Sequence, residues 1–460
     1  MRTSKLKAVI AVVLGLALFA ACNAAVSFAL EPYGSKSELT WSDYHKQQGV
    51  DTVIVGSSLV KAALDPNVLN EQCNMTAFNL ASPSQMLEES FVAIRAAHED
   101  QGVKRVIFGL SCTTLIGANA PAPQTAFLKE CNKYRAPIES FLVANEMLWH
   151  YGSAKSADSI NWMFPWVMNH CTFLPAEIKQ NIENKLNQSD LVEAAEQLEE
   201  GWKYVGLGSG AQTKSMNPNS PSVRQYTDAQ NDDEGEEGES VTETGVNPNR
   251  ARTLTEICEY CKQNNIELIF ISAPLPLYDV IDEESNYAPT MREAGEIVTG
   301  CGAKFYDFNY VTSDLFTRER GFFADNTHFN VTGGHAFSQA FARFFNEMES
   351  GQDVSHYFQT YDELKSSVDY IVALFAESHV DAQGLHVTCR AVTGPDVKVE
   401  YRLGLRREKK DKWDMVTEYS ENPEITYVPE RDGLLRLCVY ARVVGSSSDY
   451  ERYRTFMELN

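Results

Sequence analysis

The chain has 460 residues, of which 43% are hydrophobic and 11% aromatic, so it is long enough to form two globular units with packed cores. Acidic residues outnumber basic residues by 63 to 40, which gives a formal net charge of -23. This charge argues against nucleic acid as a partner, because the surface on average repels phosphate groups.

The N-terminus predicts a single membrane anchor. Basic residues stand just before an uncharged, mostly apolar run, Ala8 to Leu30, that is long enough to span a bilayer. Because flanking cations stay in the cytoplasm, the rest of the chain is expected outside the membrane. The expected location is the cell membrane, with residues 1–35 as the anchor and the bulk of the protein extracytoplasmic.

A cleaved signal peptide is the alternative. Ala20, Ala21 and Cys22 resemble a lipoprotein cleavage site. However, Phe19 fits poorly three residues before Cys22, and the apolar run continues beyond it. These two features favour an uncleaved anchor.

The first predicted strand after the anchor ends near two serines. Thr52 to Val55 is a β-branched run typical of a buried strand, and Leu59 to Leu64 has helical composition. Ser57 and Ser58 lie between them, at the carboxyl end of the strand, where open α/β sheets bind ligands. Either one serine is a nucleophile, or both only cap the helix.

Strand and helix patterns then alternate up to about Phe345. Four short runs suit a parallel sheet, namely DTVIVG, RVIFGLS, IELIFISAP and AKFYDFN. Helical stretches such as Gln85 to Gly102 and Ala251 to Asn264 separate them. This alternation predicts a three-layer α/β domain over residues 36–350.

Two stretches interrupt this pattern. Phe127 to Tyr204 is expected to be helical, and its aromatic cluster, INWMFPWVMNHCTF, is either a subdomain core or a face for the bilayer or a membrane partner. Residues from about 206 to 250 are acidic and lack aromatic side chains in their central part. They predict a disordered surface insertion, because they can bury too little apolar surface to fold.

The C-terminal part, residues 356–460, has a different pattern. GLHVTCRAV, VKVEYRLGLRR, WDMVTEY and LLRLCVYARVV are alternating strands that predict a small β-sandwich. Cys389 and Cys438 either bridge its facing sheets or remain buried thiols. Cys258 and Cys261, in the α/β region, are expected on one helix face rather than in a metal site.

A second polar cluster stands near the end of the α/β region. Asp325 and His328 are three residues apart, just before a helix that is expected to begin near Thr332. At this spacing the carboxylate can orient the imidazole ring, which takes the proton of a nucleophilic serine. Together with a serine at the end of the first strand, this pair predicts the site of a serine hydrolase.

These motifs resemble the SGNH (GDSL-like) hydrolase superfamily over about residues 40 to 350. VIVGSS is similar to its first block, which implies Ser58 rather than Ser57 as the nucleophile. DNTHFNVTGG is similar to its last block, which implies that Asp325 and His328 complete the triad.

The middle blocks of the superfamily match less fully. AFNLASPSQML is similar to the second block, which implies that the backbone N–H of Ala81 or Ser82 joins that of Ser58 in an oxyanion hole. VIFGLSCTTL departs from the third block, because it carries Ser111 where the family often has Gly-x-Asn-Asp. Ser111 is therefore only a candidate substrate-binding residue.

The anchor and the Gly-Ser-Ser motif are closer to the DltD-like and alginate-acetylation-like branch, whose members work beside a membrane-bound O-acyltransferase. The resemblance implies an O-acyltransferase or esterase that acts on an envelope polysaccharide or a teichoic-acid-type polymer, with that acyltransferase as a candidate partner. The C-terminal domain resembles immunoglobulin-like modules of cell-surface proteins. No metal or organic cofactor is expected. The alternative, favoured by the departure in the third block, is a non-catalytic surface protein that binds carbohydrate or a membrane partner.

Overall fold

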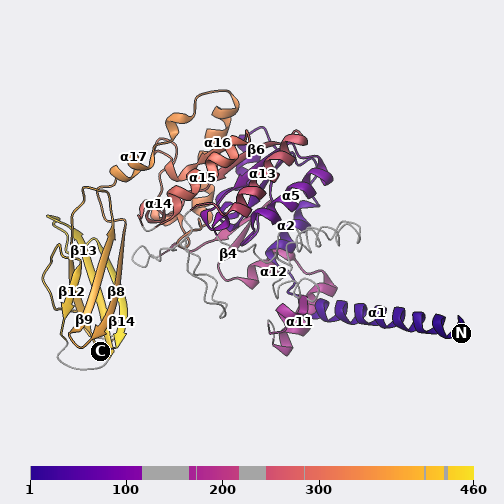
Figure 1. The fold of residues 1–460 in the computed structure, drawn as a ribbon, viewed down its shortest axis with the longest axis horizontal. Coiled ribbons are helices and arrows are strands. Elements are labelled where there is room, and N and C mark those ends of the chain that lie inside the picture. The colour runs from indigo at the N-terminus through magenta and orange to yellow at the C-terminus, as the bar shows by residue number, and fades with distance from the viewer. Residues whose placement is uncertain are drawn as a thin grey trace.

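A five-stranded parallel sheet forms the centre of the larger domain (Figure 1). The computed structural model describes residues 2–116, 165–171, 174–216, 245–283, 285–408, 411–428 and 434–459. The sheet order is β2-β1-β3-β6-β7, with strands β1 (Thr52–Gly56), β2 (Ala77–Asn79), β3 (Arg105–Gly109), β6 (Glu267–Ser272) and β7 (Lys304–Asp307). All four expected runs are strands, and the chain reverses its winding between β1 and β3. Open sheets bind ligands at the carboxyl ends of strands at such a point.

Helices cover both faces of this sheet. Successive residues of a buried strand point to opposite faces, so Val53 and Val55 enter one apolar core while Ile54 enters the other. The first core is closed by α5 (Leu87–Gln101), α13 (Pro248–Gln263) and α15 (Tyr287–Gly300), and the second by α3 (Ser58–Ala63), α4 (Pro66–Gln72) and α16 (Val331–Glu349). The expected three-layer α/β arrangement is therefore present.

Shorter elements connect these layers. They are α2 (Lys36–Tyr44), α6 (Cys112–Leu115), α10 (Pro165–Asn169), α12 (Leu191–Leu198), α14 (Leu277–Ile281) and the 3-10 turns η2 (Phe308–Tyr310) and η3 (Arg320–Phe322). Cys258 and Cys261 are buried on α13, as expected.

One expectation for the interrupting stretches is wrong. A hairpin of β4 (Trp202–Gly206) and β5 (Ser209–Gln212) lies where we expected helix and then a disordered insertion. It joins the end of the expected helical stretch to the start of the expected insertion. Its turn uses two glycines at positive φ, Gly206 and Gly208, and Trp202 is buried against Leu39. The central part of the expected insertion, 217–244, and most of the aromatic cluster lie outside the described residues.

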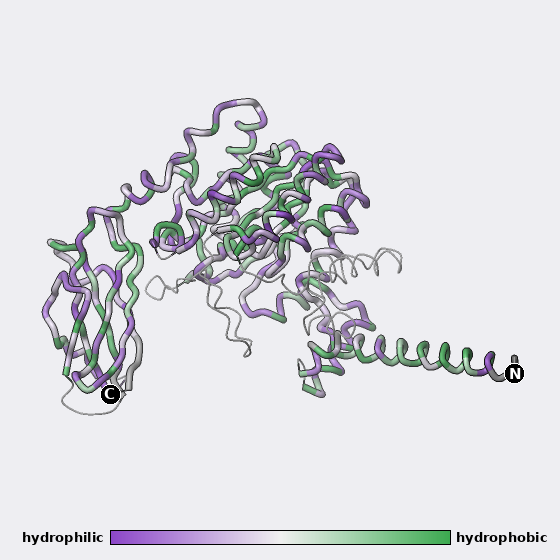
Figure 2. Tube along the Cα trace, viewed as in Figure 1, coloured by the Kyte–Doolittle hydropathy of each residue, from purple (hydrophilic) through white to green (hydrophobic). Residues whose placement is uncertain are grey.

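The N-terminal helix α1 (Arg2–Leu30) is long and apolar enough to cross a membrane (Figure 2). Its apolar window, Lys5–Leu30, is not buried in the protein. Its C-terminal end packs on α11 (Pro175–Asn187), where the Asn181 amide donates to the carbonyl oxygens of Ala29 (2.9 Å) and Glu31 (2.8 Å). The end of the apolar helix is thus capped by the α/β domain.

The C-terminal domain consists of two antiparallel sheets that enclose their own apolar core. One sheet is β12-β9-β8 and the other is β11-β10-β13-β14. The strands are β8 (Ala373–Asp381), β9 (Gly384–Val392), β10 (Val399–Arg406), β11 (Asp414–Met415), β12 (Glu424–Tyr427), β13 (Leu434–Val443) and β14 (Arg452–Leu459). Cys389 and Cys438 are buried free thiols, so the alternative without a disulfide holds.

The segment between the two domains belongs to the α/β domain. It contains the 3-10 turn η4 (Ser355–Tyr357) and α17 (Tyr361–Ser366), which packs against α14, and Leu364 lies in the first apolar core. Arg390 of β9 donates to the buried Asp282 carboxylate at 2.6 Å, which ties the β domain to the α/β domain. The strands of the β domain begin at residue 373, later than the expected boundary at 356.

Candidate functional site

Ser58, His328 and Asp325 form a chain of hydrogen bonds. Ser58 Oγ lies 2.7 Å from His328 Nε2, and His328 Nδ1 lies 2.9 Å and 3.0 Å from the two carboxylate oxygens of Asp325. The structure thus brings together the three residues that the two distant motifs predict. This is the arrangement in which a base can take the proton of a serine hydroxyl while a carboxylate orients the base.

A strained glycine turn places Ser58 at the end of β1. Gly56 has φ of +134°, and a Cβ there would lie 2.5 Å from the carbonyl oxygen of Gly109 on the neighbouring strand. Only glycine fits, so the chain can turn sharply into α3. Ser57 is the N-cap of α3 and accepts a hydrogen bond from the Leu59 N–H at 3.4 Å, whereas Ser58 begins the helix and reaches His328. The two serines therefore have different roles.

A tight loop before α16 carries the other two residues. Asp325 Oδ1 accepts the backbone N–H of both Thr327 and His328 at 2.9 Å, which holds the carboxylate inside the loop. The rings of Phe323 and Phe329 stack at a centroid distance of 4.8 Å and close the loop at its base. Contacts within this loop thus fix the position of the imidazole ring, independently of its hydrogen bond to Ser58.

Close packing of α16 on α3 brings the two segments together. A Cβ on Gly334 would lie 2.1 Å from the carbonyl oxygen of Ala62, so glycine lets the two helices approach. The Ser338 hydroxyl donates to the carbonyl oxygen of Ala63 (3.1 Å) and accepts the N–H of Asp65 (2.8 Å). These contacts set the separation between the serine and the histidine.

The site is polar and open to solvent. The side chains of His328 and Asp325 are 26% and 47% exposed. Partial burial acts to raise the pKa of Asp325. The hydrogen bond and charge of His328, together with the backbone N–H groups of Thr327 and His328, lower the pKa by more than burial raises it. The pKa of this carboxyl therefore lies well below its usual range, and Asp325 is ionised wherever the protein is folded at ordinary pH.

The expected backbone donors of the oxyanion hole are already occupied. The Ala81 N–H donates to Asn79 Oδ1 at 3.0 Å, and the Ser82 N–H donates to the Gly56 carbonyl oxygen at 3.2 Å. Both residues are buried, so these bonds hold the loop after β2 rather than face the triad. The prediction of free donors at Ala81 and Ser82 is wrong for this conformation. The Ser58 N–H, in the first turn of α3, has no acceptor inside the helix and remains a candidate.

Ser111 lies at the carboxyl end of β3 but does not reach the triad through any described contact. Its hydroxyl is 3.0 Å from the Thr113 hydroxyl and 3.3 Å from the Thr114 hydroxyl, both in its own turn. The residue is 3% exposed. Ser111 occupies the N-cap position of α6, but its hydroxyl bonds to side chains of its own turn and makes no capping bond, and nothing described supports a substrate-binding role for it.

Lys61 is a buried lysine close to Ser58 that sequence patterns did not indicate. It follows Ser58 by three residues and is 2% exposed. Its ammonium donates to the Thr40 hydroxyl (3.0 Å) and to the carbonyl oxygens of Ala81 (3.0 Å) and Gly208 (2.5 Å). Three acceptors match the three N–H donors of an ammonium group. Lys61 thereby ties α3 to α2, to the loop after β2 and to the β4–β5 turn.

We expect Lys61 to make stability depend on pH. Burial, and next the charge of Lys36, lower the pKa of Lys61 to about 7. In the unfolded chain its pKa is about 10.4, so between about pH 7 and about pH 10 the unfolded state binds more protons and stability rises with pH. Over this range the wild-type protein should gain up to about 1.4 kcal/mol of unfolding free energy per pH unit relative to Lys61→Met.

Denaturant unfolding of both proteins across this pH range measures the effect of Lys61. Taking the difference between the two proteins removes the contribution of every other titrating group, because both proteins contain those groups. A difference in unfolding free energy that stays constant with pH would contradict the expectation.

A cavity of about 380 Å³ lies behind the Asp325 loop. Tyr278 and Phe323 line it together with the Arg318 side chain, and the Tyr278 hydroxyl also donates to Asn326 Oδ1 at 3.1 Å. Ser58 and His328 are not among its lining residues. This cavity is therefore separate from the Ser58–His328 contact.

No protein-family model matches the sequence, and no curated protein matches it. Function must therefore be inferred from the chemistry of the site itself.

Proposed function

We propose that this chain is a membrane-anchored acyl-ester enzyme of the SGNH type, with Ser58 as nucleophile, His328 as base and Asp325 as the residue that orients the base. The observation that carries the proposal is the continuous hydrogen-bonded chain from Ser58 Oγ through both imidazole nitrogens to the Asp325 carboxylate. Its position at the winding reversal of a parallel sheet adds support, since ligands bind there in open α/β sheets.

These three groups can carry out acyl transfer through an ester formed on Ser58. Ser58 Oγ forms a bond to the ester carbonyl carbon while its proton passes to His328 Nε2, and the leaving alcohol takes that proton when the ester C–O bond breaks. The acyl-serine ester is then attacked by a second hydroxyl, whose proton again passes through His328. Water as the attacking group gives an esterase, and a sugar or polymer hydroxyl gives an O-acyltransferase.

The openness of the site supports a large substrate. Small ligands are usually enclosed in deep pockets, whereas His328 and Asp325 are substantially exposed. An envelope polysaccharide or a teichoic-acid-type polymer can reach such a site on the outer side of the membrane, beside a membrane-bound O-acyltransferase that supplies the acyl group.

One observation favours a second candidate function, a non-catalytic surface protein with a degenerate hydrolase domain. The N–H groups of Ala81 and Ser82, which the resemblance assigns to the oxyanion hole, have acceptors inside the protein. Oxyanion donors supply a large part of the catalysis in serine hydrolases. Such a protein would bind carbohydrate or a membrane partner without turning it over.

A fluorophosphonate probe distinguishes the two candidates, because it reacts with a serine that a neighbouring base activates. We expect covalent labelling of the detergent-solubilised full chain, with the adduct located on Ser58 by peptide mass spectrometry. A folded protein that neither reacts with the probe nor hydrolyses simple acetyl esters would favour the binding protein. Partition of the acyl group between water and added polysaccharide fragments then separates esterase from transferase.

We also propose that α1 is retained as a transmembrane anchor. The Trp166 indole donates to Asn23 Oδ1 at 2.7 Å, and Asn181 caps the end of the helix. A lipoprotein cut before Cys22 would leave these contacts intact, so a mass measurement must decide. We expect the intact mass of the membrane form to include the residues before Cys22, and Cys22→Ser to leave processing and membrane retention unchanged. A mature chain that begins at an acylated Cys22 would contradict the anchor.

A further inference from the structure

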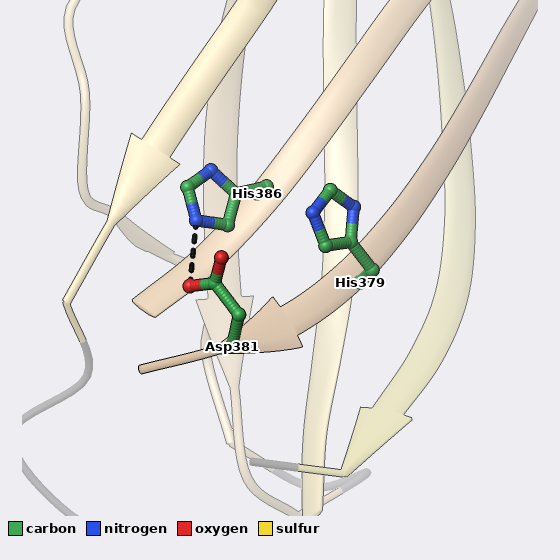
Figure 3. A group of neighbouring side chains, drawn as sticks. All are labelled: His379, Asp381 and His386. Atoms are coloured by element: carbon green, nitrogen blue, oxygen red, sulfur yellow. Dashed lines mark hydrogen bonds and ion pairs between the residues drawn. The ribbon is translucent and has the colours of Figure 1, made fainter. Parts of the chain in front are cut away.

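Three potential metal ligands gather at the closed end of the β8–β9 hairpin (Figure 3). His379 and Asp381 are two residues apart on β8, so they lie on the same face of the strand. His386 of β9 stands directly opposite His379 in the register of the two strands. One ligand atom from each residue lies within 4.8 Å of the others, and the two imidazole rings stack at 4.9 Å.

The contacts around His386 suit a metal ligand. Its Nε2 is 3.0 Å from Asp381 Oδ1, and its Nδ1 is 3.3 Å from the hydroxyl of Thr426 on β12. With the proton on Nδ1, the ring donates to Thr426 and turns the lone pair of Nε2 toward the carboxylate. Two acceptors then face each other, an arrangement that a cation between them stabilises. A partner on the second nitrogen also fixes the tautomer of metal-binding histidines.

The carboxylate is held in place by the turn between the two strands. The backbone N–H of Gln383 donates to Asp381 Oδ1 at 2.7 Å. Both His379 and Asp381 are exposed, so their side chains can move without disturbing the apolar core. Ligand atoms around a tetrahedral Zn²⁺ lie roughly 3.4 Å apart. The 3.0 Å contact between His386 Nε2 and Asp381 Oδ1 must therefore open slightly, and His379, whose ligand atom lies within 4.8 Å of the others, must move closer.

We propose that His379, Asp381 and His386 form a binding site for a divalent transition-metal ion, with Zn²⁺ as the expected occupant. Two imidazoles and one carboxylate favour Zn²⁺, Ni²⁺ or Cu²⁺ over Ca²⁺ and Mg²⁺, which prefer oxygen ligands. The ion links β8 to β9 beside their turn and keeps coordination positions for water. This site lies in the β domain and is independent of the triad.

A simple surface ion pair is the competing explanation. The contact between Asp381 and His386 needs no third residue, and exposed pairs of this kind contribute little to stability. The two explanations differ at His379, which stacks on His386 but donates no described hydrogen bond to Asp381 in the ion pair. His379→Gln is therefore the decisive variant, and the exposed residue can be replaced without a cavity.

The test is calorimetric titration of ZnCl₂ into the full chain in detergent, purified on a histidine-free tag and stripped with EDTA. We expect saturable binding that His379→Gln and His386→Gln each weaken by about tenfold or more, since one of three ligands is lost. His356→Gln, which replaces a histidine outside the cluster, should bind Zn²⁺ as the parent does and shows that other histidines do not account for the signal. CaCl₂ should give no saturable binding to this site.

Thermal melts complete the test of the zinc site. Zn²⁺ should raise the transition temperature of the parent and of His356→Gln, but not that of His379→Gln. Without metal, all three should melt at the same temperature, which shows that the fold is intact. No saturable Zn²⁺ binding, or equal affinity in the parent and His379→Gln, would overturn the proposal in favour of the ion pair.

Discussion

Replacing Ser58 with alanine is expected to abolish fluorophosphonate labelling and to lower acyl-ester turnover by about ten-thousand-fold or more. The variant removes the only hydroxyl that contacts His328 Nε2 among the described hydrogen bonds of that atom. His328→Ala should have a similar effect, because the serine then has no base to take its proton. Turnover of simple acetyl esters and the rate of labelling by the probe measure both variants.

Ser57→Ala is the matched control for Ser58→Ala. Both changes remove one hydroxyl from the same turn, but the Ser57 hydroxyl accepts only the long 3.4 Å bond from the Leu59 N–H. Its loss should cost about 1 kcal/mol of stability and leave turnover within a few-fold of wild type. Loss of activity in Ser57→Ala with activity kept in Ser58→Ala would show that the assignment of the nucleophile is wrong.

Replacing Asp325 with asparagine is expected to lower turnover by about a thousandfold to ten-thousandfold while the protein stays folded. The asparagine Oδ1 can still accept the N–H groups of Thr327 and His328, so the loop keeps its shape. Its amide nitrogen, however, donates toward His328 Nδ1. The histidine proton then moves to Nε2, and that nitrogen can no longer accept the proton of Ser58.

Stability measurements at different pH values check the same variant. Because the folded pKa of Asp325 lies below its unfolded value of about 3.9, the carboxylate contributes stability above that pH and loses it as pH falls. The melting temperature of wild type should therefore exceed that of Asp325→Asn near neutral pH, and the difference should shrink below about pH 4. A difference that grows on acidification would contradict an ionised Asp325 in the folded protein.

The places of Ser58 and His328 along the chain could be predicted because local interactions determine them. A β-branched run forms β1, a glycine that tolerates positive φ ends it, and a capping serine starts α3 directly at Ser58. Asn330 caps α16 by accepting the N–H of Gly333, so His328 lies just before a helix, as expected. Capping and strand or helix periodicity act over a few residues, which a sequence displays directly.

Contacts between distant segments could not be predicted in this way. Sequence alone did not show that the Ser82 N–H donates to the Gly56 carbonyl oxygen or that Lys61 reaches a carbonyl 147 residues away, since a backbone group has no sequence signature for its partner. The β4–β5 hairpin was not predicted because an acidic segment follows it closely.

The cluster of His379 and His386 could not be predicted either, because it depends on strand register. Register places side chains opposite one another only when the sheet has formed. Local patterns in the sequence were enough to place the strands and helices near the site and to single out Ser58, Asp325 and His328 as candidates. Which backbone N–H groups remain available beside them depended on the folded packing, because packing selects the partner of each hydrogen-bonding group.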